Sequence, residues 1–417
     1  MKHVIIGNGP AGVIAAETLR KHDPGSSITM IGNEPEPPYS RMALPYLMMG
    51  EIAEAGTYLR KADGHFARLN IDLVCDRVET VDVGARSVKL QSGRIVAYDR
   101  LLIATGAHAT TPEIPGIDLP GVHACWTMDD ARRIIARAVA GSRVLQIGAG
   151  FIGCIIMEAL KARGVQLTVV EMGDRMVPRM MTPAAGTMLR DWCEREGVRV
   201  HVATRVTAIR RADGGRDALV ATLDSGNELE AETLIVAAGV RPNVDFLDGS
   251  GIVCETGVSV DATMQTSAPG VYAAGDVAAA IDFSTGVRGM NAIQPNAVEQ
   301  ARIAALNMAG RRVESHGSFA LNVLDTLGLI SSSFGQWWGE PGGQSAELVD
   351  ADAFRYLSLQ FKDDVLIGAT SIGLTEGVGV LRSLVESRVS LGPWKDRLLS
   401  DPLRFPDAYL ARAQAAA

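Results

Sequence analysis

The hydrophobic pattern changes its period twice near the start of the chain. A continuous apolar run at residues 3–6 predicts a buried strand, and a glycine-containing turn follows it. Apolar positions then recur at helical spacing to about Lys21, and a second apolar run from Ser27 predicts another buried strand. The order strand, helix, strand is typical of a βαβ unit with parallel strands.

The same order recurs later in the chain. A second βαβ pattern starts at Arg143 and closes at residues 166–171. Each pattern is followed by a strand-rich stretch that ends in a small-residue turn, "ATG" at residues 104–106 and "AAG" at residues 237–239. This repetition indicates an internal duplication and predicts an α/β fold with two Rossmann-like three-layer domains.

Two further features divide the chain. The proline-rich stretch at residues 111–121 is typical of an inter-domain linker. From about Ser315 the pattern changes to antiparallel-type strands and then to a helical stretch at residues 377–389, which predicts a small α+β C-terminal domain.

Composition and charge exclude several classes of protein. The chain of 417 residues is 47% hydrophobic and 21% charged, with 44 glycines and a net charge of −8. No block of Lys and Arg is long enough to follow a phosphate backbone, so no nucleic-acid partner is expected. No apolar run approaches the length of a membrane span, and none is expected.

The five cysteines are scattered along the chain. Their spacing excludes a CxxC zinc or redox motif and any local CxxxxC pair, and no metal site is expected. Reduced, mostly buried thiols are typical of a cytoplasmic protein, which is the expected location.

The first glycine turn has the pattern of a dinucleotide-binding loop. In the stretch Gly7, Asn8, Gly9, Pro10, Ala11 and Gly12, the first glycine forms the turn, the second lets backbone amides approach a pyrophosphate, and the third allows close packing. The N-terminus of the following helix supplies N–H groups for the anion. An acidic residue should follow to hold the ribose hydroxyls, and Glu34 is the candidate, with Asn33 as the alternative.

The second glycine turn comprises Gly148, Ala149, Gly150, Phe151, Ile152 and Gly153. Glu171 ends the strand that follows it. A carboxylate at that position accepts from the ribose 2′-hydroxyl and repels a 2′-phosphate, which favours NADH over NADPH. Arg175 lies close enough in sequence to leave the NADPH alternative open.

These motifs occur in a fixed order with "VRPN" at residues 240–243 and "TSAPGVYAAGDV" at residues 266–277. In that order, over roughly residues 1–315, the chain resembles the two-dinucleotide-binding flavoproteins, the pyridine nucleotide-disulfide oxidoreductases related to glutathione reductase. The resemblance implies FAD in the first Rossmann-like domain and NAD(P)H in the second, where Glu171 favours NADH. It also implies that hydride passes from nicotinamide to flavin.

The resemblance also implies domain limits and site residues. The FAD domain would comprise residues 1–112 and 240–315, the NAD domain residues 113–239, and a C-terminal interface domain residues 316–417. Asp276 would hold the ribityl chain, and the helix that begins at Pro295 would point at the flavin, where its dipole stabilises negative charge. Further residues implied at the FAD site are Arg41, Ala104, Thr105, Gly106, Gly275 and Asn296, and Gly239 is implied at the NAD site.

Three positions depart from the family pattern. Met42 stands where many relatives have a redox cysteine, and methionine forms neither a thiolate nor a mixed disulfide, so disulfide reduction through that residue is excluded. Tyr46 replaces a flavin-side lysine, and Ile155 replaces a glutamate near the nicotinamide. These three are the flavin-proximal candidates, although no catalytic residue is assigned. The chain is therefore similar to the rubredoxin and ferredoxin reductase branch or the NADH oxidase branch, without redox cysteines.

The resemblance implies an FAD-dependent NADH:acceptor oxidoreductase that passes electrons directly to an iron–sulfur or rubredoxin-type protein. Two alternatives stay open: an NADH oxidase or reductase of a small molecule such as oxygen or a quinone, and a flavoprotein subunit of a larger metalloenzyme complex. The C-terminal domain resembles a domain that forms dimer or partner interfaces, so a homodimer is expected. Within it, the pair Trp337 and Trp338 is interpreted either as an interface anchor or as a strand with one tryptophan buried.

Overall fold

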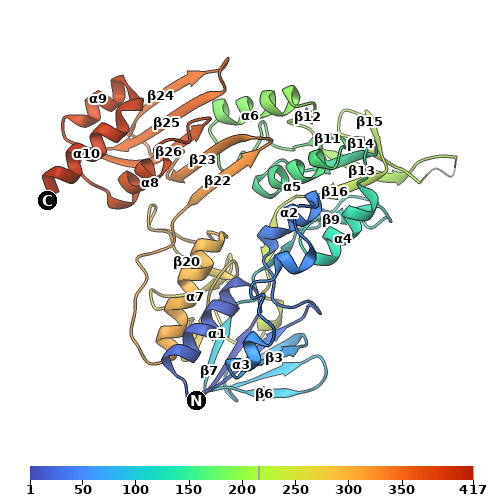
Figure 1. Cartoon of the computed structure of the whole chain (residues 1–417), viewed down its shortest axis with the longest axis vertical. Helices are drawn as coiled ribbons and strands as arrows, with labels where there is room; N and C mark the ends of the chain where they lie inside the picture. The colour runs from blue at the N-terminus through green and yellow to red at the C-terminus, as the bar shows by residue number, and fades with distance from the viewer. Residues whose placement is uncertain (215–216, 417) are drawn as a thin grey trace. The chain divides into compact units, whose positions relative to one another are not determined.

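The structure is a computed structural model that describes residues 1–214 and 217–416. The chain folds into two compact units (Figure 1). Unit 1 comprises Met1–Leu47, Ile52–His108 and Val240–Phe319, and unit 2 comprises Met48–Glu51, Ala109–Gly239 and Ala320–Ala417. Each unit therefore combines segments that are far apart in the sequence.

Unit 1 is built on a parallel sheet of five strands with the order β19-β7-β1-β2-β3. Two helices, α1 and α7, pack against each other and contact this sheet. The bounds are β1 Lys2–Ile6, α1 Pro10–His22, β2 Ser27–Gly32, β3 Ile71–Cys75, β7 Arg100–Ile103, β19 Val271–Ala273 and α7 Gln294–Met308.

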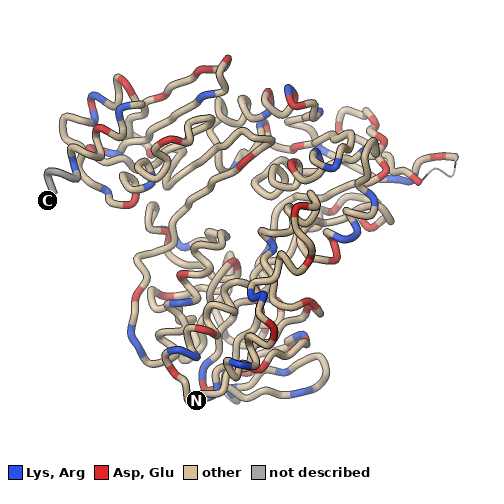
Figure 2. The backbone as a smooth tube through the Cα atoms, viewed as in Figure 1, with Lys and Arg blue, Asp and Glu red and all other residues tan. Residues whose placement is uncertain are grey.

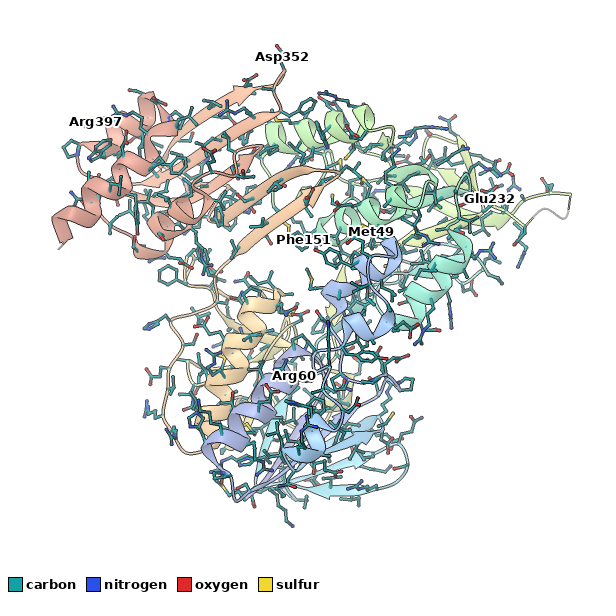
Figure 3. The ribbon with its side chains drawn as sticks, in the orientation of Figure 1. Met49, Arg60, Phe151, Glu232, Asp352 and Arg397 are labelled. Atoms are coloured by element: carbon teal, nitrogen blue, oxygen red, sulfur yellow. The ribbon has the colours of Figure 1, made fainter. Side chains whose placement is uncertain are left out.

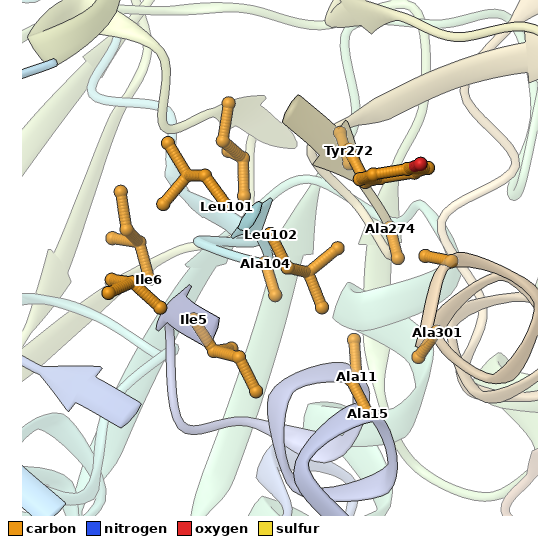
Figure 4. Packing of buried hydrophobic residues seen from close by; sticks show 14 of the residues in the cluster. Ile5, Ile6, Ala11, Ala15, Leu101, Leu102, Ala104, Tyr272, Ala274 and Ala301 are labelled. Atoms are coloured by element: carbon orange, nitrogen blue, oxygen red, sulfur yellow. The ribbon is translucent and has the colours of Figure 1, made fainter. Parts of the chain in front are cut away.

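The core of unit 1 lies between this sheet and its helices. Figure 4 shows Ile5 of β1 and Leu102 of β7 packed near Ala11 and Ala15 of α1, all of them buried. The small residues on α1 allow the helix to approach the strands closely, because an alanine side chain adds little distance between the layers. The βαβ unit predicted at the start of the chain is present at the predicted place.

The other elements of unit 1 are short. An antiparallel meander, β4-β5-β6, follows β3, and β18, β20 and β21 form a separate three-stranded sheet. The bounds are η1 Arg41–Ala43, α2 Leu44–Met49, η2 Glu54–Thr57, α3 His65–Arg68, β4 Val78–Asp82, β5 Ser87–Leu90, β6 Ile95–Ala97, η3 Asp245–Leu247, β18 Val258–Ser259, β20 Ala278–Ile281 and β21 Arg288–Gly289. The last two residues of α2 belong to unit 2, and β8 Ala107–Ala109 pairs with β17 Val240–Pro242 where the chain passes between the units.

Unit 2 contains a second parallel sheet of five strands, with the order β12-β11-β10-β16-β9. The antiparallel meander β13-β14-β15 follows β12 in the chain. The bounds are β9 Val122–Ala124, α4 Met128–Arg137, β10 Arg143–Ile147, α5 Phe151–Ala162, β11 Gln166–Val170, α6 Pro183–Arg195, β12 Arg199–His201, β13 Val206–Arg211, β14 Leu219–Leu223, β15 Glu228–Ala231 and β16 Thr233–Val236.

The two parallel sheets have matching topologies. β1, β2 and β3 correspond in sheet order to β10, β11 and β12, and β7 and β19 correspond to β16 and β9. The predicted duplication is therefore present in the strand order as well as in the sequence. The strand at the far edge differs in origin, because β19 comes late in the chain whereas β9 comes just before its own βαβ unit.

The C-terminal part of unit 2 is an antiparallel sheet with the order β22-β23-β26-β25-β24, accompanied by helices α8, α9 and α10. The bounds are β22 Leu321–Thr326, β23 Leu329–Gly335, β24 Gln344–Asp350, β25 Arg355–Lys362, β26 Val365–Ile372, α8 Val378–Ser387, α9 Trp394–Ser400, η4 Pro402–Arg404 and α10 Phe405–Ala416. The pattern at residues 377–389 predicts α8 but not the two helices that follow it. Trp337 and Trp338 lie in the turn that follows β23 and not in a strand, so the strand interpretation is wrong in that respect; Trp337 is buried, whereas Trp338 is 56% exposed.

Helix α6 attaches this antiparallel sheet to the parallel sheet of unit 2. The indole of Trp192 donates from Nε1 to the carbonyl oxygen of Thr326 at 3.0 Å, and its ring meets Phe354 edge to face at 5.0 Å. The hydroxyls of Thr182 and Tyr356 lie 2.6 Å apart. Polar and aromatic contacts thus connect α6, which also contacts β12 of the parallel sheet, to the antiparallel sheet.

The mixed α/β class with parallel Rossmann-like sheets is confirmed, whereas the predicted domain limits stay a prediction. Figure 2 shows acidic and basic residues interspersed along the chain within each unit. Among the described residues, no helix is long and apolar enough to cross a membrane, and no group of His, Cys, Asp and Glu could hold a metal ion.

Candidate dinucleotide-binding sites

The first glycine loop leaves space at only one of its three glycines. Gly7 has a φ of +112°, and an added Cβ would lie 2.1 Å from the carbonyl oxygen of Ala104. A Cβ on Gly12 would lie 2.0 Å from the carbonyl oxygen of Gly7, whereas nothing lies within 4 Å of a Cβ on Gly9. The outer glycines thus hold helix and strand together, and the middle glycine faces open space that a pyrophosphate can approach.

Helix α1 presents its N-terminus at this loop. Gly9 is its N-cap residue and has no side chain to pair with the first N–H groups, and Pro10 occupies the first turn. No acidic residue lies in that turn. The partial positive charge of the helix end is therefore left for a ligand anion. Ala11 is buried behind the loop.

Glu34 lies just beyond β2, where it is held by two neighbouring side chains. Its Oε2 accepts from the Tyr39 hydroxyl at 2.6 Å, and its Oε1 accepts from the Arg41 guanidinium at 2.6 Å. The carboxylate keeps further lone pairs for ribose hydroxyls, because each of its oxygens can accept more than one hydrogen bond. Asn33, the alternative, is exposed.

The turn at residues 104–106 is tied to the segment that returns from unit 2. Thr105 donates from Oγ1 to the carbonyl oxygen of Asn243 at 2.9 Å, and the amide of Asn243 donates back to the carbonyl of Thr105 at 2.8 Å. The backbone N–H of Asn243 also donates to the carbonyl oxygen of Gly106 at 3.0 Å. Ala104 is the close neighbour of Gly7 described above. These bonds hold the turn next to the first glycine loop.

Asp276 has an unusual environment in unit 1. It follows Gly275, whose N–H donates to Oε1 of Gln300 at 2.9 Å, but no described residue donates a hydrogen bond to the Asp276 carboxylate. Burial raises the pKa of Asp276, and the charge of Arg41 partly opposes this shift. A partly buried carboxylate without donors is unfavourable by itself, so this group fits a ligand that brings hydroxyl donors to it.

Helix α7 begins at Gln294, 18 residues after Asp276 in the chain. Its N-cap residue, Ile293, has no capping side chain, and Pro295 lies in the first turn. The amide of Asn296 is already used, because it donates to the carbonyl oxygens of Asn291 at 3.1 Å and Phe319 at 3.2 Å. Asn296 therefore anchors the chain around the helix start, and the uncapped backbone N–H groups are what remain for a ligand.

The second glycine loop, in unit 2, repeats the geometry of the first. Gly148 has a φ of +100°, and an added Cβ would lie 2.4 Å from the carbonyl oxygen of Ala237. A Cβ on Gly153 would lie 2.4 Å from the carbonyl oxygen of Gly148, whereas nothing lies within 4 Å of a Cβ on Gly150. Phe151 (labelled in Figure 3) and Ile152 begin α5, and both are partly exposed. Nothing lies within 4 Å of a Cβ on Gly239, at the neighbouring turn.

Glu171 follows β11 and folds back onto the second loop. Its Oε2 accepts from the N–H of Ala149 at 2.6 Å, and its Oε1 accepts from the N–H of Gly173 at 2.6 Å. The side chain of Arg175 is engaged locally, donating to the carbonyl oxygens of Pro178 and Met181 at 3.1 Å each. The cation nearest in sequence to Glu171 is thus occupied in shaping its own loop.

The departures from the family pattern lie in separate units. Met42 and Tyr46, in unit 1, are each 50% exposed, and Ile155 lies partly buried on α5 in unit 2. Three residues that hold the loops are absent from the predicted set, namely Tyr39, Gln146 and Gln300. Gln146 could have been noticed, because it is a polar residue inside the continuous apolar run of β10.

Residues 1–305 match the protein family described as pyridine nucleotide-disulphide oxidoreductase. The chain belongs to this family. It is 32% identical over 406 residues to a protein named as the epsilon subunit of the NADH-dependent phenylglyoxylate dehydrogenase of Aromatoleum evansii, a match that covers 96% of this chain and 95% of the relative.

Other members of the pyridine nucleotide-disulphide oxidoreductase family are also similar over most of their length. The ferredoxin–NAD(+) reductase component of a biphenyl dioxygenase system from Paraburkholderia xenovorans (strain LB400) is 32% identical over 392 residues, 93% of each chain. The crystal structure of a ferredoxin reductase for the CYP199A2 system from Rhodopseudomonas palustris superposes with a TM-score of 0.82 at 27% identity, covering 89% of this chain and 91% of that chain.

This membership confirms the class of protein and its cofactors. The chain is a flavoprotein oxidoreductase that uses FAD and NADH. The residues around both glycine loops fit these groups, since each loop offers one open glycine, an uncapped helix N-terminus and a carboxylate. The individual site residues stay predictions that rest on this geometry.

Proposed function

We propose that the protein is an NADH:acceptor oxidoreductase whose acceptor is an iron–sulfur or rubredoxin-type protein. The observation that carries the proposal is the chemistry of the segment at residues 39–51, which contains Met42 and no thiol. Of the cysteines, Cys154 and Cys193 are buried, and burial raises the pKa values of both thiols. These observations do not support a route through a disulfide in this segment. They favour direct electron transfer from the flavin to a partner.

The similarity to a ferredoxin–NAD(+) reductase component over 93% of the chain supports the same choice of acceptor. It includes the C-terminal antiparallel sheet, so the likeness is not confined to the dinucleotide-binding parts. Bound FAD supplies the conversion between the two-electron chemistry of NADH and the one-electron chemistry of an iron centre.

The residues of unit 1 would hold FAD in a definite orientation. The open face at Gly9 and the N-terminus of α1 bind the pyrophosphate, and Glu34 accepts from the adenosine ribose. Asp276 accepts from the hydroxyls of the ribityl chain, and the uncapped start of α7 stabilises negative charge.

The residues of unit 2 would bind NADH and release its oxidised form. The open face at Gly150 and the N-terminus of α5 bind the pyrophosphate, and Glu171 accepts from the ribose 2′-hydroxyl. Because Arg175 is occupied with backbone carbonyls, the 2′-phosphate of NADPH would meet the Glu171 carboxylate without a free cation from that residue.

The proposal is tested by anaerobic titration of the purified yellow protein with NADH, followed by mixing with an oxidised two-iron ferredoxin, a rubredoxin or air-saturated buffer. Flavin absorption should bleach near stoichiometric NADH and return quickly with one of the two iron proteins. Rapid return only in air would replace the proposal with an NADH oxidase. If NADH failed to bleach a flavin that dithionite reduces, the proposal would be wrong.

The similarity over nearly the whole chain to the epsilon subunit of a dehydrogenase favours a second candidate, a flavoprotein subunit of a larger metalloenzyme. On that candidate, the reduced protein transfers electrons slowly to every free small iron protein and to oxygen. Co-expression with the proteins encoded next to it, followed by size-exclusion chromatography, would distinguish the two. A stable complex with restored acceptor reduction supports the subunit.

The division into an FAD domain, an NAD domain and a C-terminal interface domain, a homodimeric assembly and a cytoplasmic location are part of the same proposal. The strand-rich C-terminal part of unit 2 offers the exposed Trp338 and an edge strand, β24, as surface for a partner or a second copy. Sedimentation equilibrium measures the assembly directly.

A further inference from the structure

Gln146 is a polar residue in the interior of a parallel sheet. It lies on β10 between Val169 of β11 and Ile235 of β16, and its side chain has no exposed surface. Its Nε2 donates to the carbonyl oxygen of Gly148 at 2.9 Å and to that of Gly153 at 3.0 Å. One amide group therefore joins the beginning and the end of the second glycine loop.

The bond to the carbonyl oxygen of Gly148 also fixes the orientation of the peptide group between Gly148 and Ala149. The carbonyl of Gly148 and the N–H of Ala149 belong to one planar group, so the orientation of one determines the orientation of the other. That N–H donates to Oε2 of Glu171 at 2.6 Å. Gln146 and Glu171 thus hold a single peptide plane from opposite sides, and each bond polarises the peptide in favour of the other.

The first glycine loop provides an internal comparison. Ile5 occupies the position of Gln146 in the matching strand β1, and it is buried among apolar side chains (Figure 4). The space is equivalent, because Cγ2 of Ile5 lies 3.5 Å from a Cβ built on Gly12, and Nε2 of Gln146 lies 3.0 Å from a Cβ built on Gly153. In unit 1 the acidic residue Glu34 is held by two side chains instead of by the loop.

The fold by itself gives no reason for a glutamine at this position. Its Oε1 is buried and has no hydrogen-bond partner among the described residues, which is unfavourable. An apolar side chain satisfies the same strand in the first copy. The amide must therefore contribute something that the second loop needs and the first does not.

We propose that Gln146 is a positioning residue for the dissociable dinucleotide, which it serves by holding the second glycine loop and Glu171 in the binding geometry before the ligand arrives. This inference rests on the proposed function, in which NADH enters and leaves at every turnover while FAD stays bound. A loop that is already ordered loses less conformational freedom on binding, so the ligand binds more tightly. The first loop is ordered by its permanent cofactor and has no such requirement.

The test uses the FAD-loaded protein and two variants, Gln146→Met, which keeps the length of the side chain, and Gln146→Ile, which copies the first loop. Leu145→Met is the matched control, because it changes a buried residue of the same strand without touching the loop. Isothermal titration with ADP-ribose, which has the pyrophosphate and ribose but no nicotinamide, should give a dissociation constant raised about tenfold in both Gln146 variants and unchanged in the control. The KM for NADH should rise by a similar factor with kcat unchanged.

The melting temperatures of the Gln146 variants should match that of Leu145→Met. Loss of the two hydrogen bonds to the carbonyl oxygens of Gly148 and Gly153 is unfavourable, but removal of the buried, unpaired Oε1 is favourable and offsets it. Wild-type affinity for ADP-ribose in the variants would overturn the inference, and so would loss of folding in both, which would assign Gln146 to stability alone. If the wild-type protein binds ADP-ribose but NADH leaves the flavin oxidised, the proposed function fails while the role of Gln146 stands. If the wild-type protein does not bind ADP-ribose, both the proposed function and the proposed role of Gln146 fail.

Discussion

Replacing Asp276 should change the stability of the apoprotein and the affinity for FAD in opposite directions. The carboxylate is partly buried, receives no hydrogen bond from a described residue, and has a pKa raised by burial. Asp276→Asn removes the buried charge, so the FAD-free protein should become more stable at neutral pH. The same change should weaken FAD binding, because the ligand hydroxyls lose a charged acceptor.

The magnitude follows from the hydrogen bonds that FAD would bring. A hydrogen bond to a charged group contributes about 1.5–3 kcal/mol, so Asp276→Ala should lower FAD affinity about 10- to 150-fold. Asp276→Asn keeps a neutral acceptor and should lower it by about fivefold. The matched control is Asp248→Asn, at an exposed position of the same unit.

The pH dependence has a definite sign. Because the pKa of Asp276 is raised in the folded apoprotein, the stability that this group contributes is fully present below the ordinary aspartate pKa and is lost as pH rises through the raised value. Hydroxyl donors favour the charged form, so FAD affinity should increase as pH rises over the same range. Both dependences should disappear in Asp276→Asn.

Quenching of FAD fluorescence, titrated into apoprotein at a series of pH values, measures the affinity, and thermal unfolding of the apoprotein measures the stability. The reasoning is refuted if Asp276→Asn binds FAD as tightly as the wild type, or if it lowers both quantities together, as a residue with a purely structural role would.

Three further outcomes are expected. Gly150→Ala should fold normally and bind NADH about tenfold more weakly. Gly153→Ala should instead lower the free energy of unfolding by about 1–3 kcal/mol, because its Cβ would meet backbone. Identical urea unfolding curves for the two variants would contradict this. Ellman's reagent should find the same fast-reacting thiols, Cys75 and Cys254, before and after anaerobic reduction by NADH, and newly released thiols would indicate disulfide chemistry. Tyr356→Phe should lower the free energy of unfolding in urea by about 0.5–1.5 kcal/mol, because it removes the hydrogen bond between this buried tyrosine and the partly buried Thr182; an unchanged midpoint would show that the hydroxyl contributes nothing.

Local patterns were enough to predict most of the parallel framework. Apolar runs, helical spacing and glycines located β1, α1 and β2 and their counterparts β10, α5 and β11, because these elements are specified by residues close in sequence. The same patterns did not predict α9 and α10, which have no glycine-loop motif to mark their start. Such helices owe most of their stability to tertiary packing rather than to their own sequence.

The candidate sites divide in the same way. The glycine positions followed from spacing, since a turn between a strand and a helix needs small residues wherever backbones meet. The partners of the acidic residues did not follow from spacing: Glu34 is held by Tyr39 and Arg41, whereas Glu171 is held by the N–H groups of its own loop and the next turn. The distance of each carboxylate from its glycine loop thus gave no hint of how that carboxylate is held.

By itself, the sequence determined a duplicated α/β chain with two dinucleotide loops and no cysteine within residues 39–51, and its resemblance to a known family implied a flavoprotein. Only the tertiary structure decided that β19 joins the sheet of unit 1, that the Asp276 carboxylate lacks donors, and that Gln146 joins two glycine carbonyls. The physical reason is that strand order and hydrogen-bond partners depend on where distant segments meet, whereas the period of a strand or helix depends on its immediate neighbours.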